Sequence, residues 1–135
     1  MNPTHLLDTS VYCQPLKPIP STSVQNRWNS LGNERLAISI ICEAELLFGL
    51  ELKQSSKLTA AFEHTLKNRL RCLPVDGTVA ITYSQMKALA RRKGHVCSDF
   101  DFLIAATAKA HNLILATLNF RHFNGIEGLA VEDWS

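Results

Sequence analysis

The sequence predicts an α/β domain with a mainly parallel central sheet. Short apolar runs typical of strands alternate with longer segments of helical pattern, and such chains form right-handed crossovers that cover both faces of a sheet. The chain has 135 residues, of which 46% are hydrophobic and 19% charged, as in a folded globular domain. No internal repeat or break in composition divides it, so we expect one domain over residues 1–135.

The first elements are two buried strands separated by a proline-rich loop. Leu6-Leu7 ends abruptly in Asp8-Thr9-Ser10, as a buried strand does at the edge of a sheet. Prolines between residues 15 and 23 force any helix that begins at Val11 to end early. The patterns that follow predict a short helix over 24–31, a turn over 29–33 and a second strand over 36–41.

The rest of the chain continues the alternation of helix and strand. Turn signals at Asp76-Gly77 and Gly94 bound one helix, and Asn112 suits a left-handed helix cap. The predicted elements are a helix from 43 to 68 interrupted near Ser55-Ser56, a strand over 70–75, a helix over 79–92, an alanine-rich helix over 102–110, a strand over 113–117, a loop through 119–123 and a strand over 129–131.

Net charge, cysteine spacing and the N-terminal sequence indicate the partners, the redox state and the location that we expect for the protein. A net charge of +2 permits contact with nucleic acid without requiring it. The cysteines at 13, 42, 72 and 97 have no paired spacing, so we expect reduced thiols. The longest apolar runs are far shorter than the roughly 20 residues that cross a bilayer, and residues 1–8 lack a basic segment followed by an apolar core. We therefore expect no membrane segment and a cytoplasmic location.

Oxygen-bearing side chains recur at strand ends and helix starts. Asp8 follows the first strand, Glu45 and Asp101 lie near the starts of two helices, and Asn119 follows the strand over 113–117. In a parallel sheet these positions share one edge, where ligands bind beside the point at which strand order reverses. Carboxylates gathered there repel one another unless a cation neutralises them. Mg²⁺, or Mn²⁺ in its place, suits such oxygen ligands.

Each of these residues also has an ordinary structural explanation. Ser98-x-x-Asp101 fits a capping box at a helix start. Glu43 and Glu45 favour a first helical turn, and because they are two positions apart at most one of them faces the site. Asp8 suits a turn and Asn119 a loop. Only their joint placement at successive strand ends favours a metal site.

The same residues lie in segments that resemble the PIN-domain family and, within it, the VapC-type toxins of bacterial toxin–antitoxin pairs. The match covers nearly the whole chain and becomes specific because all the segments occur in order. These segments are 6–11 (LLDTSV), 38–50 (ISIICEAELLFGL), 101–108 (DFLIAATA), 115–123 (LATLNFRHF) and 126–134 (IEGLAVEDW).

The resemblance implies a three-layer α/β/α sandwich and a Mg²⁺-dependent endoribonuclease. It carries the family's acidic positions onto Asp8, Glu45 and Asp101, with Asp8 and Asp101 as metal ligands, and leaves Glu43 outside the site. Asn119 stands at the fourth acidic position, and an amide cannot supply charge to a second cation. We therefore expect one tightly held metal, or a second only when RNA is present. Residues expected to support the site are Thr9, Ser10 and, as a neighbour, Asp99.

The expected reaction is in-line attack of a metal-activated water on an RNA phosphodiester, which, as the resemblance implies, leaves a 5′-phosphate and a 3′-hydroxyl. Four cations are candidate phosphate contacts, although such side chains are more often solvated surface charges: Arg91, Arg92, Lys93 and Arg121. His122 is left outside the catalytic set because two-metal chemistry does not require it. Which RNA is cut is not readable from the sequence.

The resemblance also implies a homodimer and a cognate antitoxin protein. Trp28 and Phe48 are candidates for docking an antitoxin helix. The simpler alternative is that both side chains pack in the hydrophobic core. Two other functions fit the same residues. One is an RNA-processing nuclease without an antitoxin, and the other is a binding module that kept the fold and lost catalysis, for which Asn119 is the relevant feature.

Overall fold

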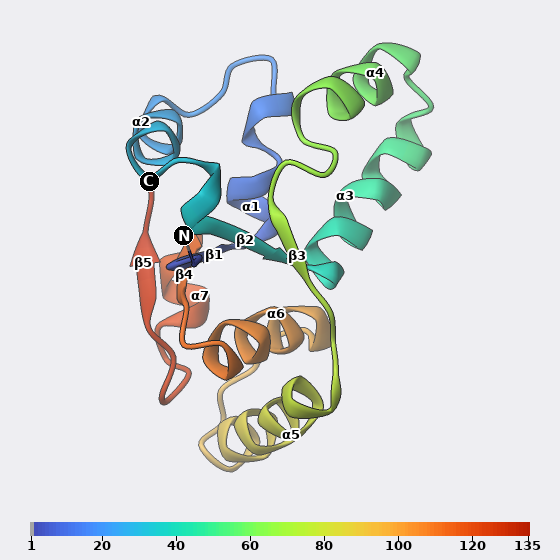
Figure 1. The fold of residues 1–135 in the computed structure, drawn as a ribbon. Coiled ribbons are helices and arrows are strands. Elements are labelled where there is room, and N and C mark those ends of the chain that lie inside the picture. Colours follow the sequence, from blue (N-terminus) through green and yellow to red (C-terminus); the bar gives the residue numbers. More distant parts are fainter. Residues whose placement is uncertain (1) are drawn as a thin grey trace.

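The computed structural model describes residues 2–135 and contains a parallel sheet between two layers of helices (Figure 1). Residue 1 of the expected domain lies outside the described residues. The strands are β1 (His5–Leu7), β2 (Leu36–Ser39), β3 (Arg71–Leu73), β4 (Ile114–Thr117) and β5 (Val131–Asp133), arranged in the order β3-β2-β1-β4-β5. All neighbouring pairs are parallel, which confirms the predicted α/β class.

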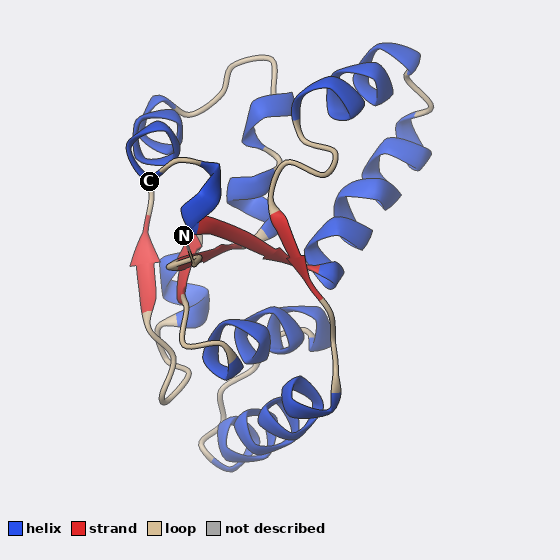
Figure 2. Cartoon of the chain, in the orientation of Figure 1, coloured by secondary structure: helices blue, strands red, loops and turns tan. Residues whose placement is uncertain are grey.

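Helices cover both faces of the sheet (Figure 2). They are α1 (Thr9–Tyr12), α2 (Thr22–Leu31), α3 (Ile40–Lys53), α4 (Ser56–Thr65), α5 (Gly77–Arg92), α6 (Asp99–Ala110) and α7 (Phe120–Phe123), with 3₁₀ turns at Gln14–Leu16 and Asn33–Arg35. Helices α5 and α6 lie on one side, and α1, α2 and α4 on the other (Figure 1). Within residues 2–135, every helix is too short or too polar to span a bilayer.

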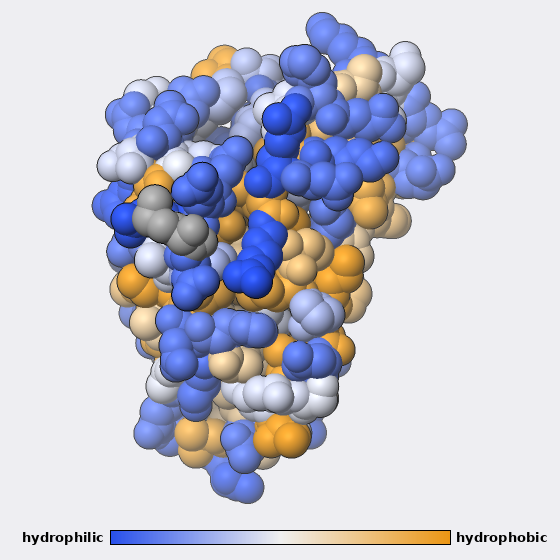
Figure 3. Space-filling view, viewed as in Figure 1, coloured by the Kyte–Doolittle hydropathy of each residue, from blue (hydrophilic) through white to orange (hydrophobic). Residues whose placement is uncertain are grey.

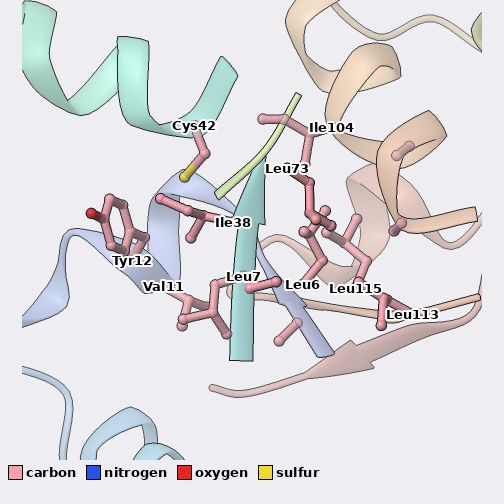
Figure 4. Packing of buried hydrophobic residues seen from close by; sticks show 14 of the residues in the cluster. Leu6, Leu7, Val11, Tyr12, Ile38, Cys42, Leu73, Ile104, Leu113 and Leu115 are labelled. Atoms are coloured by element: carbon pink, nitrogen blue, oxygen red, sulfur yellow. The ribbon is translucent and has the colours of Figure 1, made fainter. Parts of the chain in front are cut away.

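The core forms on both faces of the central strand β1. Leu6 and Leu7 are fully buried and, because side chains alternate along a strand, they face opposite layers. Figure 4 shows Leu7 on the side of Val11 from α1, and Leu6 on the side of Ile104 from α6. The apolar run at 6–7 is continuous because both faces of a parallel sheet are buried.

Side-chain caps begin most of the helices. In each case a hydroxyl or carboxylate oxygen accepts a hydrogen bond from a backbone N–H in the first turn, which satisfies one of the amides left free at a helix start. The capping residues are Asp8, Ser21, Ser39, Ser55, Asp76 and Ser98. Two of them, Asp8 and Ser98, lie at or beside the predicted site.

The ends of several elements differ from the predictions. Strand β2 ends at Ser39 rather than at residue 41, because the Ser39 hydroxyl caps α3 and moves Ile40 and Ile41 into that helix. Strand β3 covers 71–73 rather than 70–75, since Pro74 has no N–H to donate to a neighbouring strand. The turn predicted at 76–77 is the capped start of α5.

The last part of the chain contains the largest differences. The segment 120–123, expected as loop, is the short helix α7. The last strand lies at 131–133 rather than at 129–131, where it pairs with β4 through Val131, Glu132 and Asp133. An apolar pattern did not reveal it, because this edge strand is partly exposed and carries two acidic residues.

Two predicted breaks are confirmed. The helical segment from 43 to 68 is divided at Gln54, which adopts a left-handed conformation with φ of 49° between α3 and α4. Asn112 follows α6 with φ of 55°, as expected for a left-handed cap.

Candidate active site

The predicted acidic residues line one cavity at the carboxyl edge of the sheet. Strand order reverses between β1 and β4, so the ends of these strands leave a crevice between them. The cavity has a volume of about 650 Å³ and is lined by Asp8, Thr9, Ser10, Glu45, Asp101, Asn119, Arg121, His122 and Asp133, with apolar walls from Ile104, Leu118, Phe120 and Phe123. The structure therefore brings together all four predicted catalytic residues.

Asp8 is the most constrained of the carboxylates. Its side chain is buried, with an exposed fraction of 4% for the residue. One oxygen, Oδ1, accepts hydrogen bonds from the Ser10 hydroxyl at 2.5 Å and from the Val11 N–H at 3.2 Å. The other oxygen, Oδ2, accepts from the Thr117 hydroxyl at 2.6 Å. Both oxygens are therefore fixed in direction.

The electrostatic surroundings of Asp8 favour a cation. Burial raises the pKa of Asp8 and outweighs the hydrogen bonds from Ser10, Thr117 and Val11, which lower it; the negative charge of Asp101 adds to the rise. A carboxylate is costly in such a place unless positive charge accompanies it. The donors available in the cavity are mainly oxygens, which suit a hard divalent ion such as Mg²⁺ or Mn²⁺.

Glu45 enters the cavity from α3. Its Oε1 accepts a hydrogen bond from the Thr9 hydroxyl at 2.7 Å, so Thr9 supports this carboxylate as predicted. Glu43 instead accepts a hydrogen bond from the Tyr12 hydroxyl at 3.1 Å and does not line the cavity. Only one of the two glutamates faces the site, as their spacing predicts.

Asp101 lies in the first turn of α6, where its backbone N–H donates to the Ser98 hydroxyl at 3.2 Å. This bond is one half of the predicted capping box. Within residues 2–135, the reciprocal bond from the Ser98 N–H to the Asp101 carboxylate is absent. The Asp101 Oδ2 instead lies 2.7 Å from His122 Nε2.

The carboxylates share the cavity without forming a closed metal cage. Among the residues that the structure describes, no three His, Cys, Asp or Glu side chains gather closely enough to hold an ion. Glu45 and Asp101 are engaged by Thr9 and His122. Oxygen ligands from Asp8 and Asp101 with several waters remain the predicted site, which suits Mg²⁺ because this ion keeps part of its water shell.

Other predicted residues lie outside the cavity. Asp99 is exposed and accepts hydrogen bonds from Lys87 at 2.5 Å and from the Tyr83 hydroxyl at 2.9 Å. Lys93 pairs with Glu127, and Arg91 lines a separate small cavity. Of the four candidate phosphate contacts, Arg121 is the one beside the acidic residues.

Three residues of the site were not predicted from the sequence. The Thr117 hydroxyl donates to Asp8, and its position as the polar residue that ends an apolar run resembles the pattern at Asp8. Asp133 lines the cavity from β5, a strand that was predicted two residues too early. His122 was expected to lie outside the catalytic set, but it lines the cavity and contacts Asp101.

Comparisons with known proteins find relatives that match nearly the whole chain. The PIN domain family matches residues 5–128. Among relatives, the tRNA(fMet)-specific endonuclease VapC of Shigella flexneri is 33% identical over 130 residues, which cover 96% of this chain and 97% of that protein. Toxin FitB of Neisseria gonorrhoeae is also 33% identical, with 96% of this chain and 97% of that protein covered.

Solved structures share the whole fold. The crystal structure of FitAcB from Neisseria gonorrhoeae superposes with a TM-score of 0.88 and 34% identity, covering 97% of this chain and 98% of that one. VapBC2 from Rickettsia felis, bound to a DNA fragment from its promoter, gives a TM-score of 0.88 and 27% identity, with 98% and 99% covered. The chain belongs to the PIN domain family and, within it, to the VapC-type proteins.

Proposed function

We propose that the protein is a metal-dependent endoribonuclease and the toxin of a cytoplasmic toxin–antitoxin pair. The observation that carries the proposal is the convergence of Asp8, Glu45 and Asp101 on one cavity at the switch point of the sheet. Relatives that match over nearly their full length are named as ribonucleases or endonucleases, two of them specific for tRNA(fMet), which supports RNA as the substrate class.

In this proposal Asp8 and Asp101 hold the ion. A divalent cation supplies positive charge to the scissile phosphodiester and lowers the pKa of a bound water. Asp8 is suited to ligation because Ser10, Val11 and Thr117 fix its orientation before anything binds. Glu45 lines the same cavity beside Thr9, where its carboxylate would accept a proton from the attacking water. The water oxygen would bond to phosphorus as the P–O3′ bond breaks, and the leaving 3′ oxygen would take a proton from solvent, which gives a 5′-phosphate and a 3′-hydroxyl.

Asn119 and Arg121 complete the cavity without adding negative charge. Asn119 contributes an amide where a fourth carboxylate would otherwise increase repulsion, which supports a single tightly held ion. Arg121 is exposed at the cavity wall, where a guanidinium can bind an RNA phosphate with paired hydrogen bonds. The other three predicted phosphate contacts would meet RNA only outside the cavity.

The proposal includes an antitoxin partner and a homodimer. Solved relatives include VapBC and FitAB assemblies, and helix α3 leaves Phe48 and Leu52 exposed at 67% and 72%. Figure 3 shows hydrophobic side chains on one face between the α3–α4 pair and α5. Trp28 is a weaker docking candidate, because it packs against the core and donates its Nε1–H to Asn33 at 2.7 Å.

The test is cleavage of total RNA by the purified protein with Mg²⁺ or Mn²⁺, with EDTA as the chelator control. D8N and D101N remove charge from the two proposed ligands at nearly constant shape, and we expect both to abolish cleavage. D76N is the matched control, because Asp76 caps α5 outside the cavity and asparagine caps equally well. Cleavage unaffected by D8N and D101N would refute the proposed site.

Expression in cells separates the alternative functions. We expect growth arrest that a small co-expressed neighbouring protein relieves and that D101N abolishes. An RNA-processing nuclease would cleave RNA without such relief, and a binding module would arrest or alter growth equally in the D101N variant.

A further inference from the structure

His122 makes one contact that the proposed reaction does not use. Its side chain is 43% exposed at the cavity wall, and its Nε2 lies 2.7 Å from Asp101 Oδ2. An ionised carboxylate only accepts hydrogen bonds, so the imidazole donates through Nε2–H. The contact joins α7 to α6 across 21 residues of sequence.

The same carboxylate has a second possible partner inside its own helix. Ser98 caps α6, and Asp101 occupies the position from which an acidic side chain usually folds back to the N–H of the capping residue. The Ser98 hydroxyl does accept from the Asp101 N–H at 3.2 Å, but the Asp101 side chain is turned to His122. Two orientations of one side chain therefore compete, one toward the helix start and one toward the cavity.

The His122 ring is itself held in place. Its neighbour Phe123 is buried, and the two rings meet edge-on with centroids 5.2 Å apart. Its backbone carbonyl accepts a hydrogen bond from the Cys97 thiol, with the sulfur 3.7 Å away. Burial and, to a smaller degree, the charge of Asp101 raise the pKa of Cys97 to about 11, so the thiol keeps the proton that it donates.

We propose that His122 is a positioning residue that turns the Asp101 carboxylate away from the start of α6 and into the cavity. The inference rests on the proposed function in taking Asp101 as a metal ligand, and it adds a residue that acts on that ligand. His122 does not touch substrate in this role. Without it, the Asp101 carboxylate satisfies the Ser98 N–H, and an ion must then break that bond before it binds.

The test compares H122A and H122Q with the wild type. Glutamine places an N–H donor at a reach similar to that of histidine, whereas alanine removes the donor. In the metal-free protein, we expect H122A to move the Ser98 amide resonance downfield and to slow its hydrogen exchange, because Asp101 bonds it. Mn²⁺ affinity measured by calorimetry should fall about tenfold in H122A, as for other groups that orient metal ligands, and H122Q should restore most of it.

Two further variants separate positioning from a general effect on the fold. H64A removes an exposed histidine from α4 and should change neither readout. In the double variant H122A/D101A the shift of the Ser98 amide should disappear, since no carboxylate remains to bind it. If H122A does not fold, H122N, whose side chain is too short to reach Asp101, gives the same comparison.

The outcomes distinguish this inference from the proposed function. If D101N weakens Mn²⁺ binding while H122A leaves both the affinity and the Ser98 amide unchanged, His122 has no positioning role and the proposed function stands. If the wild type neither binds Mn²⁺ nor cleaves RNA, the proposed function fails, and the Ser98 amide alone still decides whether His122 orients Asp101.

Discussion

At the scale of single residues, the buried carboxylate of Asp8 destabilises the metal-free fold, and the same carboxylate is the proposed metal ligand. Its carboxylate is buried, and burial together with the charge of Asp101 raises its pKa despite the bonds from Ser10 and Thr117. Without a cation, an ionised group in such surroundings destabilises the fold relative to a neutral one of the same shape.

We therefore expect D8N to raise the melting temperature in EDTA by about 3 °C, equivalent to about 1 kcal/mol, while cleavage is lost. The Thr117 hydroxyl can rotate to accept from the new amide, so the variant keeps its hydrogen bonds. Thermal unfolding followed by circular dichroism measures the change, with D76N as the control that should not shift. A lower melting temperature for D8N would mean that the hydrogen bonds to the Asp8 carboxylate stabilise the fold by more than the burial of its charge destabilises it.

A site residue could be predicted where an oxygen-bearing side chain followed a predicted strand or began a predicted helix. Asp8, Glu45, Asp101 and Asn119 follow strands or begin helices, and parallel pairing brings such positions to one edge. The side-chain direction of Asp101 was not predictable, because the capping bond and the bond to His122 are equally compatible with the sequence. Only the placement of α7 against α6 decides between them.

At the scale of elements, the junction between α6 and β4 depends on one left-handed residue. Asn112 has φ of 55°, a conformation that asparagine and glycine adopt more easily than other residues, and β-branched residues least easily. We expect N112V to lower the free energy of unfolding by about 1 to 2 kcal/mol and N112G to leave it nearly unchanged. Urea unfolding measures both. Equal loss in the two variants would show that the Asn112 side chain, not its backbone, stabilises the junction.

Strand β5 is held at the edge of the sheet by Glu132. The carboxylate oxygen Oε1 accepts from Trp134 Nε1 at 2.8 Å and Arg27 Nη1 at 3.0 Å, and lies 3.2 Å from His5 Nε2. Burial by itself raises the pKa of Glu132, but the bond from Trp134 and the neighbouring His5 and Arg27 outweigh it, so the pKa lies below its usual value.

A lowered pKa fixes the sign of the pH dependence. Ionised Glu132 stabilises the fold above the pKa of the unfolded chain, about 4.5, and this contribution is lost as the pH falls through the folded-state pKa. We expect E132Q to be less stable than the wild type at pH 7, and the difference to shrink below about pH 4. Urea unfolding at both pH values checks this. A difference that grows in acid would contradict the assignment.

Helices were easier to predict than the strands at the sheet edges. Caps and left-handed residues mark helix ends locally, as at Ser98 and Asn112. Strand β5 owes its position to pairing with β4 and to the contacts of Glu132 with Arg27 and His5, which lie far away in sequence. Ile40 and Ile41 continue an apolar run into α3, and a pattern of hydrophobicity does not show where a strand becomes a helix.

At the scale of the whole molecule, the proposed function requires RNA to approach an acidic cavity on a protein of net charge +2. Arg121 is the candidate cation that lines this cavity. In a D101N background, in which we expect no cleavage, R121Q should weaken binding of single-stranded RNA. In a plot of the log association constant against the log salt concentration, the magnitude of the negative slope should decrease by about 0.7, which is the value for one lost phosphate contact.

Fluorescence anisotropy over a series of NaCl concentrations measures this slope. R92Q serves as the comparison, because Arg92 lies exposed at the end of α5 and does not line the cavity. If the magnitude of the slope decreases more in R92Q than in R121Q, RNA binds along α5 and away from the cavity wall.

The strand order also determines when the proposed site can form during synthesis of the chain. The central strand β1 pairs with β4, and Asp8 depends on a hydroxyl from residue 117. A growing polypeptide that emerges from the ribosome therefore contains Asp8 long before it contains Thr117, the residue that orients the Asp8 carboxylate. Synthesis must therefore pass residue 117 before the proposed site can act on RNA.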